Sequence, residues 1–144
     1  MRAAVLALKN GNERRLSRDL AQLLCPLIPA ADVDFITWVP TTQPRARLRG
    51  YDHAELIARS AGMYLGIPVR RLLRRDDREA QQGKNRASRL VGPRVSATPS
   101  ARGKRVVLVD DVVTTGATMR TCRDALLAAG AASVLMVAVA GARN

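Results

Sequence analysis

The feature of this sequence that most constrains its fold is an apolar run that passes without a break into two acids and a turn of small residues. Residues 106–109 read Val-Val-Leu-Val, and Asp110 and Asp111 follow them directly. A continuous aliphatic run without alternation is typical of a strand that is covered on both faces. We therefore expect a buried strand over residues 106–109, with the two acids at its C-terminal end.

A helix is expected directly after this strand and turn. Met119, Cys122, Leu126 and Ala129 recur at helical spacing until Gly130 ends the pattern. A turn at the start of a helix presents backbone N–H groups and threonine hydroxyls, and the partial positive charge there favours an anion such as phosphate. A sugar that carries a phosphate would fit this turn and the two acids together. The turn residues are Thr114, Thr115, Gly116, Ala117 and Thr118.

The same stretch has a simpler explanation, in which a buried strand meets an ordinary helix cap and the two acids only solvate the strand end. That explanation needs both acids and the phosphate-type turn to coincide by accident. Neither a Walker A lysine motif nor a G-x-G-x-x-G fingerprint occurs in the sequence. Nucleotide hydrolysis and dinucleotide binding therefore lose support.

The length and composition indicate one soluble α/β domain over residues 1–144. The chain has 47% hydrophobic but only 3% aromatic residues, so Val, Leu, Ile and Ala must fill its core. Its two cysteines, Cys25 and Cys122, are far apart, which indicates neither a disulfide framework nor a zinc knuckle. The sequence shows neither a signal-peptide pattern nor a membrane-length apolar run. A cytoplasmic protein without membrane contact is the expectation.

Positive charge is concentrated in the middle of the chain. The net charge is +12, and 16 of the 24 basic residues lie between Arg45 and Arg105, against 5 acids in the same stretch. Such a region attracts a pyrophosphate, a nucleic-acid backbone or an acidic partner protein, and charge does not choose among them. Tyr51 and Tyr64 are its only aromatic residues, which weakens the case for a platform that stacks single-stranded bases.

The remaining pattern predicts helices and strands around the central unit. Two short helices are expected over residues 2–9 and 13–24, strands over 35–39, 69–73 and 133–139, and a helix that begins at a capping box of Asp52 and Glu55 and closes at Gly66. We interpret His53, beside that helix start, as a capping or surface residue. Residues 74–104 are polar and charged, and we expect a long flexible loop there, either a lid or a disordered segment.

Residues 106–118 resemble the phosphoribosyl pyrophosphate (PRPP) signature of type I phosphoribosyltransferases at nearly all of thirteen positions. Three further segments resemble the ComF/GntX-like branch, which is associated with competence and DNA uptake. They are the chain start, residues 47–58 (Arg-Leu-Arg-Gly-Tyr-Asp-His-Ala-Glu-Leu-Ile-Ala) and residues 81–89. The chain departs from that branch in lacking the N-terminal cysteine-rich zinc module, and in having Lys84-Asn85 where Leu-Ser is usual.

The resemblance implies an α/β fold with a mostly parallel central sheet flanked by helices. It adds a small N-terminal helical hood over residues 1–30 and a flexible loop over residues 74–104. The implied activity is a glycosyl transfer of nucleotide metabolism, in which the phosphoribosyl group of PRPP passes to a nitrogen acceptor and pyrophosphate leaves. Mg²⁺ would come with PRPP, and Asp110 and Asp111 are the protein groups that could contact it. A metal held by protein ligands alone is not expected.

The resemblance also implies roles for individual residues. Asp110 and Asp111 form the catalytic pair and accept hydrogen bonds from the ribose hydroxyls, while residues 114–118 wrap the 5-phosphate. Pro40, Thr41 and Thr42 are candidates for the pyrophosphate loop, although a plain connector explains them equally well. Candidate cations for the leaving group, each with a solvated surface role as its alternative, are Arg45, Arg47, Arg49, Lys84 and Arg86.

Three functions stay open at this point. The chain could be a PRPP-using transferase, or a non-catalytic module that binds PRPP or phosphate while its basic region engages single-stranded DNA or a DNA-uptake partner. It could also be an adaptor whose pocket is vestigial, although the intact acids and turn count against this. A homodimer is the default expectation for self-association. The acceptor cannot be derived from the sequence.

Overall fold

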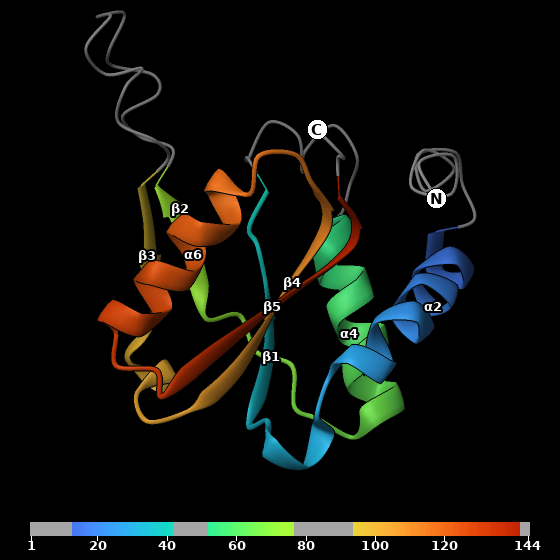
Figure 1. Cartoon of the computed structure of the whole chain (residues 1–144), viewed down its shortest axis with the longest axis horizontal. Helices are drawn as coiled ribbons and strands as arrows, with labels where there is room; N and C mark the ends of the chain where they lie inside the picture. The colour runs from blue at the N-terminus through green and yellow to red at the C-terminus, as the bar shows by residue number, and fades with distance from the viewer. Residues whose placement is uncertain (1–12, 42–51, 77–93, 142–144) are drawn as a thin grey trace, which may run out of the picture.

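A three-stranded parallel sheet forms the centre of the computed structural model, which describes residues 13–41, 52–76 and 94–141 (Figure 1). Its strand order is β1-β4-β5, with β1 at Phe35–Trp38, β4 at Arg105–Val113 and β5 at Ser133–Gly141. Residues 68–70 extend the other edge of β1, where Ile36 N donates to Pro68 O at 3.0 Å and Arg70 N donates to Ile36 O at 2.9 Å. Parallel pairing throughout this sheet confirms the expected α/β class.

The apolar run in β4 lies between two hydrophobic clusters and contributes side chains to both. Val107 and Val109 belong to one cluster, and Val106 and Leu108 belong to the other. All four side chains are at most 2% exposed. Because successive side chains of a strand point to opposite faces, an unbroken run of aliphatic residues places apolar groups in both clusters. The prediction of a strand covered on both faces is confirmed.

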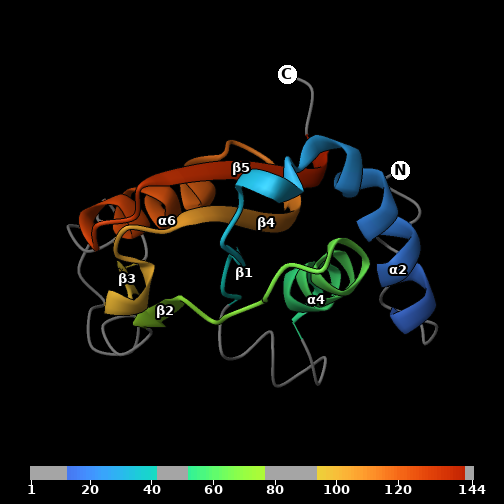
Figure 2. The ribbon, with the colours of Figure 1, turned by 90° about the horizontal axis from the view of Figure 1, so that it is seen from below.

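Helices cover the two faces unequally. The helices α2 (Glu13–Leu24) and α4 (His53–Leu65) pack into the cluster that contains Val107, while α6 (Ala117–Ala128) packs into the cluster that contains Leu108. Figure 2 shows α2 and α4 together in one part of the molecule and α6 with β2 and β3 in another. Short 3₁₀ helices at Cys25–Leu27 and Ala30–Asp32 lead from α2 into β1. None of the helices in the described ranges is both long and apolar enough to cross a membrane.

A second, two-stranded sheet forms where the two ends of the flexible loop were predicted. The strands β2 (Leu73–Asp76) and β3 (Arg94–Ala97) pair antiparallel, and a 3₁₀ helix at Pro99–Ala101 follows them. The loop expected over residues 74–104 is therefore too long at both ends, and residues 77–93 lie outside the described part of the chain. The strand expected over residues 69–73 is also misplaced, because Val69 makes only a single bridge to Ile36 and β2 begins at Leu73.

Several element boundaries follow the expected signals. Asp52 caps α4, since its Oδ1 accepts from Ala54 N at 3.1 Å, and Gly66 ends the helix with φ of 70°. A positive φ of this size is costly for residues other than glycine. His53 is the first helical residue and is only 5% exposed, so its interpretation as a surface residue is wrong. The helix expected over residues 2–9 lies outside the described residues.

Candidate ligand-binding site

The strand β4 extends further than expected and carries both acids inside it. Val112 pairs with Ala140 and Val113 with Gly141, so β4 stays paired with β5 beyond Asp110 and Asp111. The prediction that the acids follow the end of their own strand is therefore wrong, because β4 continues past them. The acids do lie beyond the end of the neighbouring strand, since β1 ends at Trp38, whose partner is Val109. Both acids thus lie past the C-terminal end of the neighbouring strand, at the edge where ligands gather in open α/β sheets.

The turn after β4 closes around a small hollow at the start of α6. Gly116 is the N-cap of α6 with φ of 75°, and Thr115 Oγ1 accepts from Ala117 N at 3.3 Å. The hollow measures about 50 Å³. Asp110 and all five predicted turn residues line it, whereas Asp111 is not among its described lining residues. The structure therefore brings one of the two acids and the whole turn together at a helix N-terminus.

The two acids are coupled through hydrogen bonds and charge. Asp111 N donates to Asp110 Oδ1 at 2.8 Å, and Val112 N donates to Asp111 Oδ1 at 2.8 Å. Burial raises the pKa of Asp110 to about 8, and the neighbouring Asp111 side chain adds to this shift. Asp110 therefore favours its protonated form more than an ordinary aspartate does. A ligand that donates hydroxyl hydrogen bonds or brings a cation would favour its ionised form.

Asp52 contributes to this region in a way that sequence reasoning missed. Its Oδ2 accepts from Thr41 N at 3.1 Å while its Oδ1 caps α4. Burial raises the pKa of Asp52 and the hydrogen bonds from these amides oppose the shift, and the charge of Asp52 in turn raises the pKa of Asp110. The capping pattern predicted only the bond from Ala54 N, since nothing in the spacing of residues 41 and 52 indicates the bond from Thr41 N.

The predicted pyrophosphate loop is described at two of its three residues. Val39 N donates to Val109 O at 2.9 Å, so the chain passes beside Asp110 as it continues from β1 into Pro40 and Thr41. Pro40 is buried and Thr41 is half-buried. The remaining predicted loop residue and the candidate cations lie outside the described residues, and they are Thr42, Arg45, Arg47, Arg49, Lys84 and Arg86.

A cation that the sequence did not single out lies beside the turn. A Cβ added to Gly116 would lie 2.9 Å from Arg120 Nη1, which places this guanidinium against the N-cap of α6. Arg120 is exposed, and its amide donates to Gly116 O at 2.9 Å within the first helical turn. The usable signal was its spacing, because residues four apart on a helix lie on the same side.

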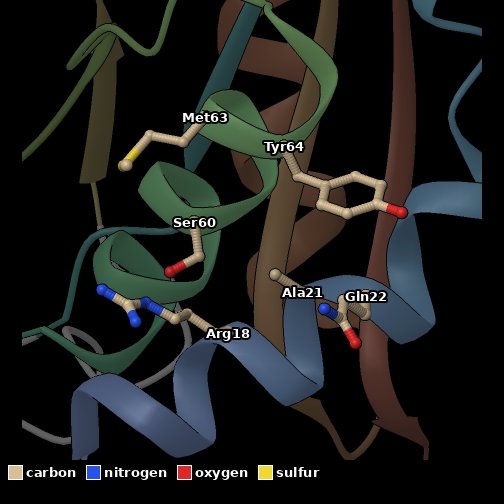
Figure 3. Close-up of a pocket in the computed structure, with 6 residues that line it drawn as sticks. All are labelled: Arg18, Ala21, Gln22, Ser60, Met63 and Tyr64. Atoms are coloured by element: carbon tan, nitrogen blue, oxygen red, sulfur yellow. The ribbon is translucent and has the colours of Figure 1, made fainter.

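A larger hollow lies elsewhere, between α2 and α4 (Figure 3). It measures about 270 Å³, and its surface is mainly apolar. Its lining residues come from α2 and α4 alone and are Arg18, Ala21, Gln22, Ser60, Met63 and Tyr64. None of the predicted site residues lines this hollow among the described residues. Likewise, no group of three or more His, Cys, Asp or Glu side chains within the described ranges could hold a metal ion.

A parallel strand carries two acids into a glycine-capped turn at a helix N-terminus, an α/β arrangement that favours anions such as phosphate. The family model described as the phosphoribosyl transferase domain matches residues 49–144, more than half of the chain. The chain therefore belongs to this family, as a type I phosphoribosyltransferase domain of the ComF-like kind.

Individual relatives agree with this assignment. Competence protein ComFC of Bacillus subtilis is 33% identical over 97 residues, which cover 66% of this chain and 39% of that protein. A glutamine PRPP amidotransferase from B. subtilis superposes with a TM-score of 0.64 at 26% identity, over 85% of this chain and 26% of that one. A purine phosphoribosyltransferase from Pyrococcus horikoshii shares the fold, with a TM-score of 0.58 at 20% identity over 87% of this chain and 73% of that one. The chain thus spans well under half of the first two proteins.

Proposed function

We propose that this chain binds PRPP with Mg²⁺ and transfers its phosphoribosyl group to a nitrogen acceptor, with release of pyrophosphate. The observation that carries the proposal is the hollow at the start of α6, where Asp110 and residues 114–118 meet. Its volume of about 50 Å³ suits a phosphate group rather than a whole nucleotide. The rest of PRPP would then extend past the acids toward Pro40 and Thr41.

The turn would hold the 5-phosphate through its backbone amides. The N-terminus of α6 supplies backbone N–H groups and partial positive charge, and Gly116 allows a close approach of the backbone. Arg120 lies beside the same turn and adds a full positive charge. Anion binding at a helix N-terminus of this kind requires no further protein ligand.

The two acids would hold the ribose. A carboxylate accepts hydrogen bonds from adjacent sugar hydroxyls more strongly than a neutral group does. Because burial beside Asp111 raises the pKa of Asp110 to about 8, binding of hydroxyl donors should release its proton. Ribose binding is therefore expected to strengthen as the pH rises toward 8.

Mg²⁺ fits the donor set at this edge of the sheet. The cation prefers phosphate oxygens and water, supplemented by one or two carboxylates, and Asp110 and Asp111 offer carboxylates directly beside each other. When bound with PRPP, it would neutralise the pyrophosphate and so improve the leaving group.

The reaction would break the bond between the anomeric carbon and the pyrophosphate oxygen, which keeps the electron pair. A nitrogen lone pair would form the new bond to that carbon, and the nitrogen would release a proton to solvent. The role of the chain's residues is to hold the phosphate and ribose in place while positive charge develops on the sugar ring. Preorganised charges and dipoles of this kind are usually the largest contribution to such catalysis.

Calorimetry with PRPP and Mg²⁺ tests the binding step. We expect saturable binding by the wild type and a loss of at least about 100-fold in affinity after Asp110→Asn combined with Asp111→Asn, since two charge-assisted hydrogen-bond acceptors are lost. Absence of binding by the wild type, or equal binding by the double variant, would exclude the proposed pocket. Pyrophosphate release over a panel of nitrogen bases and amines then tests turnover.

A second candidate is a PRPP- or phosphate-binding module without turnover that works with a DNA-uptake assembly. It is favoured by the likeness to competence protein ComFC and by the net charge of +12. A salt titration of single-stranded DNA binding tests the nucleic-acid part, because contacts to phosphates are strongest at low salt. Binding at low salt that falls steeply with added salt supports it, and no binding at low salt excludes it.

A further inference from the structure

The carboxylate of Asp52 joins two segments that meet at the site. One oxygen, Oδ1, accepts from Ala54 N at 3.1 Å and caps α4. The other oxygen, Oδ2, accepts from Thr41 N at 3.1 Å, in the loop that follows β1. Capping alone needs one acceptor oxygen, as the frequent use of serine at helix N-caps shows. The bond from Thr41 N to Oδ2 is therefore not explained by capping of the helix.

The loop that Asp52 holds lies next to Asp110, one of the two catalytic candidates. Val39 N donates to Val109 O at 2.9 Å, so Pro40 and Thr41 leave β1 next to Asp110. Asp52 is close enough to Asp110 for its charge to act on that group. Two carboxylates placed near each other repel, which is unfavourable unless each makes other bonds. Hydrogen bonds from the backbone amides of Thr41, Ala54 and Glu55 to the Asp52 carboxylate offset this cost.

We infer that Asp52 is a positioning residue, which fixes the loop at Pro40 and Thr41 against the N-terminus of α4 so that the loop can receive the pyrophosphate of PRPP. This inference rests on the proposed function. Asp52 should affect binding of the pyrophosphate end of PRPP only, because the turn at residues 114–118 would hold the 5-phosphate without help from Asp52. Loss of the tether should therefore weaken binding of PRPP and pyrophosphate but spare binding of ribose 5-phosphate.

Asp52→Ser separates the cap from the tether. A serine oxygen can still accept from Ala54 N, but a single short side chain cannot also reach Thr41 N. Asp52→Ala removes both bonds, and Arg59→Ala is a control on the same helix, where it removes an ion pair with Glu55 at 2.7 Å and a cation–π contact with Trp38. Binding of PRPP with Mg²⁺, of pyrophosphate and of ribose 5-phosphate is measured by calorimetry. Exchange of the Thr41 amide is followed by hydrogen–deuterium exchange.

We expect Asp52→Ser to bind PRPP and pyrophosphate about tenfold more weakly, as for a lost hydrogen bond to a charged group. Ribose 5-phosphate should bind within about twofold of wild type, and the Thr41 amide should exchange faster. Asp52→Ala should show the same binding losses together with a lower melting temperature. Arg59→Ala should match wild type in binding.

Unchanged PRPP affinity in Asp52→Ser, or an equal loss for ribose 5-phosphate, would overturn the inference. Failure of the proposed function gives a different result, because the wild type itself would not bind PRPP. In that event hydrogen–deuterium exchange still tests whether the bond from Thr41 N to Asp52 holds the loop. Equal exchange of the Thr41 amide in wild type and Asp52→Ser would show that it does not.

Discussion

Two hollows of the described surface differ in size, lining and surroundings. The one between α2 and α4 measures about 270 Å³ and is mainly apolar, whereas the one at the start of α6 measures about 50 Å³ and is mainly polar. Of these two, the smaller one gathers an acid, the N-terminus of a helix and a glycine with a positive φ. Its chemistry, and not its volume, therefore identifies the candidate site.

The regions behind the hollows also differ in what they do for stability. The side of α2 and α4 packs on an apolar cluster that includes Leu24, Ile36 and Ile57. The end of β4 instead buries Asp110 beside Asp111 and Asp52, and this burial raises the pKa of Asp110 to about 8. Packing stabilises the first region, while charge placed for a ligand destabilises the second. Variants in the two regions should thus separate stability from binding.

The largest stability effect is expected on the side of α4. Ile57 is fully buried in the apolar cluster, so Ile57→Ala should lower the free energy of unfolding by about 2–5 kcal/mol. Urea unfolding measures this loss, and affinity for ribose 5-phosphate in the folded variant should stay within about twofold. Met63→Ala is the control, because Met63 is 83% exposed on the same helix. A similar loss in both variants would contradict the packing account.

The next effect concerns pH and the end of β4. Asp110 has a pKa of about 8 in the folded chain against 3.8 for an unperturbed group. Between these values the folded state holds a proton that the unfolded state has lost, so wild-type stability falls as the pH rises through this window. Asp110→Asn lacks the titrating group and should therefore gain stability relative to wild type between pH 5 and 9, on the order of a few kcal/mol. Melting temperatures of both proteins at several pH values test this, and a constant difference contradicts it.

A pair of glycines offers a smaller, matched comparison. Gly116 and Gly66 have φ values of 75° and 70°, and each substitution by Ala should cost about 1 kcal/mol of stability. Only Gly116→Ala also places a Cβ 2.9 Å from Arg120 Nη1 beside the hollow, whereas nothing lies within 4 Å of a Cβ at Gly66. Ribose 5-phosphate binding should weaken in Gly116→Ala alone. Equal binding by the two variants would show that the turn does not hold the phosphate.

The smallest effect compares one arginine at each hollow. Arg120→Ala should weaken ribose 5-phosphate binding by about threefold to tenfold, because an exposed charge contributes modestly and is screened by salt. Arg18→Ala, in the lining of the larger hollow, should leave this affinity unchanged. Calorimetry at low and high salt should show the Arg120 effect shrink with salt. A larger loss of affinity in Arg18→Ala than in Arg120→Ala would indicate that the phosphate binds between α2 and α4 instead.

The sequence predicted the unit from β4 to α6 well because each of its signals is local. The unbroken apolar run, the glycine in the turn and the helical spacing of Met119 and Cys122 all act within a few residues. The extension of β4 to Val113 was missed, since it depends on pairing with β5. The short strand β2 was misplaced and β3 was missed, because a four-residue alternation is hard to recognise among arginines.

The contact between Asp52 and Thr41 is the clearest limit of sequence reasoning at the site. The capping role of Asp52 follows from the residues beside it, but its bond to Thr41 forms only after β1 and α4 have packed together. The raised pKa of Asp110 is a tertiary effect of the same kind, because it depends on burial and on neighbouring carboxylates. Residue types could be predicted from the motif, whereas their coupling needed the fold.

The most direct test of the account is a crystal structure of the chain with ribose 5-phosphate bound. We expect the phosphate to lie within hydrogen-bonding distance of backbone amides of residues 115–118, and the ribose hydroxyls to donate to Asp110 and Asp111. A phosphate bound in the hollow between α2 and α4, or a sugar that contacts neither acid, would contradict it.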